Sequence, residues 1–163
     1  MQQDTSVRQI VYFVEDAKKS YELSKRGDGF YCTIGVHPCR ATEVFKNGST
    51  VEEYHKQIES VIDEHFTDKT KLVAIGECGL DYDRLNYADK ETQHKVFPFH
   101  FDLAQKYNLP MYLHSRATEG DFVKIVKENR EKFPTGVVHS FTGDEEELNG
   151  ILDMDLYIGK QIP

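Results

Sequence analysis

The sequence predicts an α/β fold with about five parallel strands and covering helices. Short β-rich runs alternate along the chain with longer polar stretches that carry apolar residues at helical spacing, and this alternation is typical of βαβ units. The β-rich runs are apolar throughout, as expected for parallel strands that helices cover on both faces. With 163 residues, 39% of them hydrophobic and 29% charged, the chain is predicted to form a single domain over residues 1–163.

The first third of the chain predicts two helices around one strand. Ala17 and Tyr21 share a face of the helix predicted over 14–25, and the run 31–36 has the composition of a buried strand. The helix predicted over 51–66 carries apolar residues near the 3.6-residue period, and the letters "ST" just before it offer an N-cap.

The middle third predicts a strand, a long helix and a second strand. Residues 72–75 and 111–114 are the strands, and Pro110 stands harmlessly at the start of the second one. Residues 92–107 have helical periodicity, but Pro98 interrupts them. Because proline removes a backbone donor and clashes with the preceding turn, the helix is predicted to start near Pro98 or to kink there.

The last third repeats the alternation. A helix is predicted over 119–133, a strand over 136–139, a short helix over 145–152 and a final strand over 156–158. The chain shows no further sequence repeat and no composition shift that would mark a linker between domains.

The composition excludes several classes of protein. The formal net charge of −8 argues against a module that binds nucleic acid through a basic surface, although it is compatible with a metal-dependent enzyme acting on phosphates. Cys32, Cys39 and Cys78 are odd in number and lack CxxC spacing, which favours reduced thiols. The sequence has neither a run of ~20 apolar residues nor a secretory signal, so we expect a cytoplasmic or nuclear protein without a membrane partner.

Ionisable residues stand at the ends of successive predicted strands. The run "IGECGLDY" begins as a buried strand and then carries Glu77 and Asp81, while His114 and His139 end the next two strands. Since the carboxyl ends of parallel strands lie on one side of the sheet, these groups are expected to converge. A carboxylate and two imidazoles form a site for a divalent cation. We therefore predict Glu77, His114 and His139 as ligands of Mg²⁺, Mn²⁺ or Zn²⁺.

Further residues are predicted to assist that site. Asp81 is expected to orient a ligand or a water molecule, and Arg116 to hold a phosphate in a bidentate fork, so Glu77, Asp81 and Arg116 are the predicted catalytic residues. His37, in "TIGVHP", also fits a turn in which its ring hydrogen-bonds the backbone. Each residue taken singly fits a structural role as well, and the prediction depends on their repetition. Four other histidines fall in helical stretches and are expected to be structural: His55, His65, His94 and His100.

Five segments together resemble a known family. "TIGVHP", "IGECGLDYDR", "LPMYLHSR", "VVHSFTGD" and "LYIG" occur in the order of the motifs of the TatD family of metal-dependent deoxyribonucleases, over residues 14–159. The likeness is strongest to eukaryotic TatD-type enzymes, which resemble amidohydrolase-like (β/α)8 barrels. It implies that a metal-activated water hydrolyses DNA phosphodiester bonds.

The resemblance also implies residue roles. In the family's motifs the glutamate bridges two metals and the two histidines complete the second metal site, and these positions are Glu77, His114 and His139 here. The arginine and the "HP" histidine of the motifs match Arg116 and His37, which are expected to grip phosphate.

The chain departs from the family at both ends. The family opens with a strand bearing an HxH pair and continues past "YIG" to a strand with an ETD-P motif, whereas this chain has no HxH and ends "YIGKQIP". The resemblance therefore implies an incomplete domain, a partial TIM (β/α)8 barrel with barrel strands three to seven, in which Glu77 alone remains of the first metal site. Open sheet edges are expected to favour self-association.

Three functions remain open at this point. The first is a metal-dependent deoxyribonuclease with DNA as its substrate. The second is a catalytically impaired, truncated isoform that acts only as a binding or non-functional fragment. The third is an amidohydrolase for a small amide or ester, which the metal chemistry allows but the set of motifs disfavours.

Overall fold

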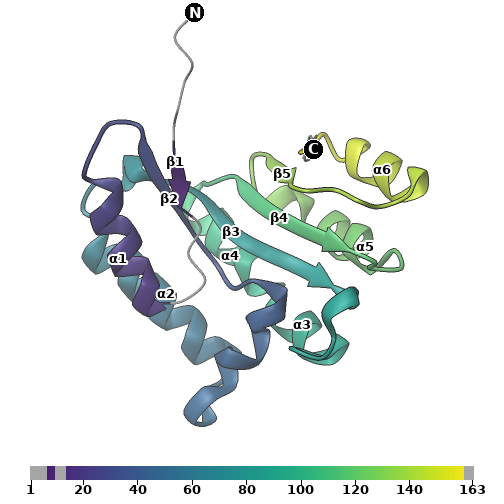
Figure 1. Cartoon of the computed structure of the whole chain (residues 1–163), viewed down its shortest axis with the longest axis horizontal. Helices are drawn as coiled ribbons and strands as arrows, with labels where there is room; N and C mark the ends of the chain where they lie inside the picture. Colours follow the sequence, from purple (N-terminus) through teal and green to yellow (C-terminus); the bar gives the residue numbers. More distant parts are fainter. Residues whose placement is uncertain (1–6, 10–13, 160–163) are drawn as a thin grey trace, which may run out of the picture.

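The computed structural model describes residues 7–9 and 14–159 and contains one parallel sheet. The described strands lie in sequence order across the sheet, and each pairs in parallel with the next (Figure 1). The predicted α/β class is therefore confirmed. The strands are β1 (Val7–Gln9), β2 (Phe30–Ile34), β3 (Leu72–Asp81), β4 (Met111–Arg116), β5 (Gly136–Val138) and β6 (Tyr157–Ile158).

Helices connect the strands, as predicted. The break expected at Pro98 is confirmed, because one helix ends at Val96 and the next begins at Phe99. Thr50 and Glu53 form a reciprocal capping box, which confirms the predicted N-cap. The α-helices are α1 (Val14–Ser24), α2 (Val51–His65), α3 (Lys90–Val96), α4 (Phe99–Tyr107), α5 (Asp121–Glu128) and α6 (Glu145–Leu152). The 3-10 helices are η1 (Pro38–Gly48), η2 (Lys69–Lys71), η3 (Tyr82–Arg84) and η4 (Arg130–Lys132).

Two strand predictions need correction. The count of five omitted β1, a short polar segment that pairs with β2 and has no apolar pattern to reveal it. The strand predicted over 72–75 continues to Asp81, because its pairing with β4 extends as far as Arg116. Glu77 and Asp81 therefore belong to the strand itself rather than to a loop after it. β1 and β6 form the edges of the described sheet, and self-association through such edges stays a prediction.

The core lies between the sheet and its helices. Phe97 packs its ring against Phe101 and Phe122, with centroid separations of 4.9 and 5.9 Å, and Phe133 lies 5.8 Å from Phe101. All four rings are buried, and full burial of one such side chain contributes roughly 1.5–3 kcal/mol. This packing joins α4 and α5 on one face of the sheet.

Two properties relevant to cellular context are visible. Cys32, Cys39 and Cys78 are free thiols, and the first and last of these are buried. Across 7–9 and 14–159, every helix is too short or too polar to traverse a lipid bilayer.

Candidate metal centre

Glu77 occupies a β-bulge in β3. Gly76 pairs with Tyr112 of β4, and Cys78 pairs with the following residue Leu113, so Glu77 has no partner of its own in the ladder. A bulge takes a side chain out of the regular alternation and is common beside active sites. Gly76 permits the close strand approach, since its φ is 134° and a Cβ there would lie 2.1 Å from the Tyr112 carbonyl oxygen. The glycine before the glutamate thus serves to aim its carboxylate.

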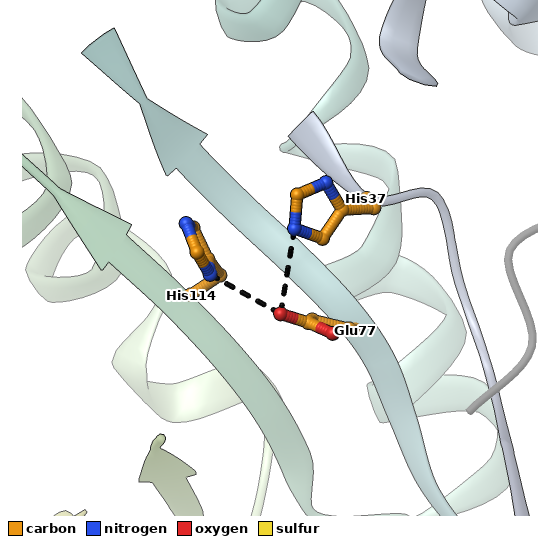
Figure 2. A group of neighbouring side chains, drawn as sticks. All are labelled: His37, Glu77 and His114. Atoms are coloured by element: carbon orange, nitrogen blue, oxygen red, sulfur yellow. Dashed lines mark hydrogen bonds and ion pairs between the residues drawn. The ribbon is translucent and has the colours of Figure 1, made fainter. Parts of the chain in front are cut away.

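Three imidazoles surround one oxygen of that carboxylate. His114 Nδ1 lies 3.1 Å from Glu77 Oε1 and His37 Nε2 lies 3.5 Å from it. His139 Nε2 forms a hydrogen bond with the same oxygen. Figure 2 shows His37 and His114 reaching the carboxylate from either side of β3, His114 from β4 and His37 from the segment that follows β2. The structure thus brings Glu77, His114 and His139 together, and their assignment as metal ligands stays a prediction.

The carboxylate of Glu77 is held in its ionised form. The residue is only 3% exposed, and burial by itself raises the pKa of Glu77. Hydrogen bonds from His114, His139 and His37 outweigh that effect and hold the pKa well below its usual range. Glu77 therefore keeps a buried negative charge, which attracts a cation, beside three imidazole nitrogens.

Asp81 stands on the far side of the His114 ring. Its Oδ2 lies 3.0 Å from His114 Nε2 and 4.0 Å from Arg84 Nε, and it accepts a hydrogen bond from Cys39 Sγ at 3.8 Å. Its Oδ1 is buried and has no hydrogen-bond partner within the described residues. His114 thus lies between two carboxylates, with Nδ1 toward Glu77 and Nε2 toward Asp81. Metal-ligating histidines commonly have such a second carboxylate behind them.

Hydrogen bonds distinguish the His37 ring from the His114 ring. The backbone N–H of Cys39 donates to His37 Nδ1 at 3.1 Å, which confirms the alternative of a ring bonded to the backbone. In the neutral ring the proton must then sit on Nε2, so His37 presents an N–H to Glu77 rather than a lone pair. His114 can place its proton on Nε2 against Asp81 and leave Nδ1 as a lone pair. His114 is therefore suited to ligate a cation and His37 to donate a hydrogen bond.

Arg116 lies at the rim of this group. Its Nε donates to Asp83 Oδ2 at 2.8 Å, and 42% of its side chain is exposed. The phosphate-holding role therefore stays a prediction, and the present partner of the guanidinium is a carboxylate. Sequence reasoning missed three further neighbours of the site: Cys39, Arg84 and Ser140. Each stands within three residues of a predicted site residue, and that proximity is the signal that could have found them.

The donor set fits a divalent cation. One nitrogen of His37, one nitrogen of His114 and one carboxylate oxygen of Glu77 lie within 4.8 Å of one another, and His114 and Glu77 are the two that their hydrogen bonds suit to ligation. Imidazole nitrogen combined with carboxylate oxygen suits Zn²⁺ and Mn²⁺.

Comparison with known proteins identifies the family of the chain. The sequence pattern of the family described as TatD related DNase matches residues 2–162. A protein of Schizosaccharomyces pombe named deoxyribonuclease Tat-D is 37% identical over 147 residues, which cover 90% of this chain and 47% of that protein. A protein of Pectobacterium parmentieri named 3'-5' ssDNA/RNA exonuclease TatD is 35% identical over 131 residues, or 79% of this chain and 46% of that protein. The chain thus spans about half the length of these relatives.

A solved structure extends the likeness to the fold. The crystal structure of a hydrolase TatD family protein from Entamoeba histolytica superposes with a TM-score of 0.78 at 35% sequence identity, covering 94% of this chain and 50% of that one. The match includes nearly the whole described sheet and so agrees with the predicted partial barrel. Together these findings confirm the resemblance, and the chain belongs to the TatD related DNase family.

Proposed function

We propose that this chain is a metal-dependent nuclease that hydrolyses phosphodiester bonds of DNA. The observation that carries the proposal is the convergence of three imidazoles on the buried carboxylate of Glu77, in a chain of the TatD related DNase family. Relatives named as a deoxyribonuclease and as an ssDNA/RNA exonuclease support DNA as the substrate class.

In the proposed centre, Glu77, His114 and His139 hold a divalent cation such as Mg²⁺, Mn²⁺ or Zn²⁺. Such a cation lowers the pKa of a water molecule and polarises a phosphoryl oxygen. Glu77 supplies the compensating negative charge, and the rings of His114 in β4 and His139 just after β5 supply lone pairs from the same side of β3. Asp81 keeps the proton of His114 on Nε2 and so fixes the orientation of that ring.

Two further residues are proposed to contact the substrate. His37 directs an N–H into the space beside Glu77 Oε1, where it can donate to an anionic phosphate oxygen. Arg116 is exposed enough to exchange Asp83 for a phosphate, because its planar guanidinium binds either anion through paired N–H groups. The acidic net charge of the chain makes these local donors necessary for holding a polyanion.

Replacing Asp81 by Asn tests the orienting role. The Asp81→Asn side chain keeps nearly the same shape but loses the charge that holds the proton on His114 Nε2. We expect the affinity for Mn²⁺ to fall about 10–100-fold, the range typical when such a partner is changed. Isothermal titration calorimetry with Mn²⁺ would measure it, with the exposed Asp153→Asn as the matched control. Equal affinities in both variants would contradict the role.

A cleavage assay tests the proposed function itself. End-labelled single-stranded and duplex DNA would be incubated with the purified chain and Mn²⁺ or Mg²⁺, with and without EDTA. We expect cleavage that requires the added cation and stops in EDTA. Absence of cleavage in every cation would instead favour the alternative, a catalytically impaired fragment that acts only by binding. Cleavage that persists in EDTA would contradict metal dependence.

A further inference from the structure

His100 is the buried histidine that the proposed function leaves unused. It lies in α4, it is fully buried, and 64 positions of the sequence separate it from Val36. Even so, the backbone N–H of Val36 donates to His100 Nε2 at 2.9 Å. Val36 immediately precedes His37, so a helix on the outer layer contacts the backbone next to a residue of the candidate centre.

The hydrogen bonds of His100 fix its tautomer. Because Nε2 accepts from Val36, the ring proton must sit on Nδ1, which faces the Phe97 carbonyl oxygen at 3.0 Å. Burial lowers the pKa of His100 to about 4, so the ring is neutral near pH 7. His100 therefore presents a permanent lone pair to the Val36 N–H.

The segment of residues 35–37, which carries His37, depends on this acceptor. β2 ends at Ile34, so the Val36 N–H lies beyond the described strand pairing, and Val36 is itself buried. Without His100 the donor would be buried and unsatisfied, which is unfavourable enough to make this segment rearrange. On the opposite side, Gly35 packs so closely on β3 that a Cβ there would lie 2.6 Å from Gly76 Cα.

The segment of residues 35–37 is thus held from two sides. Gly76, the residue before Glu77, supports it from β3, and His100 supports it from α4. His37 follows directly and is then oriented by the Cys39 N–H on its Nδ1. The same segment therefore sets the distance between the His37 ring and the carboxylate of Glu77.

We propose that His100 is a positioning residue, which aims His37 at the metal centre by accepting the Val36 N–H. The relevance of this positioning to catalysis rests on the proposed nuclease function. The positioning itself does not depend on that function. His100 touches neither substrate nor cation in this proposal and acts through the backbone of residues 36 and 37.

Two substitutions separate positioning from mere packing. His100→Gln keeps an acceptor at the place of Nε2, whereas His100→Asn keeps a donor at the place of Nδ1 and loses that acceptor. We expect the amide hydrogen of Val36 to exchange about tenfold faster or more in the Asn variant and close to the parent rate in the Gln variant. The ring signals of His37 in 15N-histidine NMR spectra should shift in the Asn variant and return in the Gln variant.

The outcomes keep the two proposals distinct. If both variants leave Val36 exchange and the His37 signals at their parent values, or change them equally, the positioning role is wrong. If the Asn variant shifts the signals but the parent shows no cleavage in any cation, positioning holds and the nuclease proposal fails. Should the Asn variant not fold, the test is the scalar coupling across the hydrogen bond between Val36 N and His100 Nε2 in the parent protein. Its presence would support the proposal, and its absence would overturn it.

Discussion

Replacing Glu77 by Gln is expected to lower the rate of DNA cleavage by about a thousandfold or more. The amide removes the buried negative charge on which His37, His114 and His139 converge. Electrostatic stabilisation by a bound cation is worth several kcal/mol, and each ~1.4 kcal/mol corresponds to a factor of ten in rate. Initial rates on end-labelled DNA with saturating Mn²⁺ would measure the loss.

The matched control for that experiment is Glu128→Gln. Glu128 is an exposed glutamate in α5, and the same chemical change there is expected to leave the rate within a factor of about two, as for most surface substitutions. Circular dichroism would verify that both variants are folded. Cleavage by the Glu77 variant at the parent rate would point to a contaminating nuclease and would remove the basis for this centre.

Replacing His114 by Ala is expected to abolish the tight binding of one divalent cation per chain. The His114 ring places one nitrogen toward Glu77 and the other toward Asp81. Its loss removes the proposed ligand and also the hydrogen bond between the ring and Asp81 Oδ2. Since changing a residue behind a ligand costs about 10–100-fold in affinity, losing the ligand should cost about 100-fold or more. Titration with Zn²⁺ or Mn²⁺, followed by elemental analysis of the dialysed protein, would measure both affinity and stoichiometry.

His65→Ala provides the comparison for His114. His65 lies in the last turn of α2, away from the strand ends that form the centre, and its loss should leave cation binding unchanged. A His114 variant that retains one tightly bound cation per chain would show that the ligands lie elsewhere. Loss of binding in both variants would indicate a general effect on folding instead.

Much of the fold could be predicted because its signals are local. Apolar runs in the sequence predicted strands β2 to β6. Pro98 predicted the break between α3 and α4, and Thr50 predicted the start of α2. Each depends on chain chemistry within a few residues. β1 escaped because it is short and polar and exists only by pairing with β2. The full length of β3 escaped for a related reason, since β4 supplies the partners that extend it.

The candidate site, like the fold, could be predicted from the sequence only in part. The sequence could predict that Glu77, His114 and His139 lie close together, because parallel strands place their carboxyl ends on one side of the sheet. The bulge that aims Glu77 could not, since it is a mismatch of register between two strands far apart in sequence. The Asp83 partner of Arg116 likewise joins two segments that the sequence alone leaves unrelated.

The sequence by itself determined the residue types, their order along successive strands, and hence the family and the chemistry they suit. The tertiary structure alone decided which nitrogen of each ring faces inward, that His37 is a donor rather than a ligand, and that His100 reaches the backbone beside it. The physical reason is the distance along the chain over which each kind of interaction acts. Propensity and periodicity act over a few residues, whereas a hydrogen bond that fixes a tautomer requires two groups to meet across the fold.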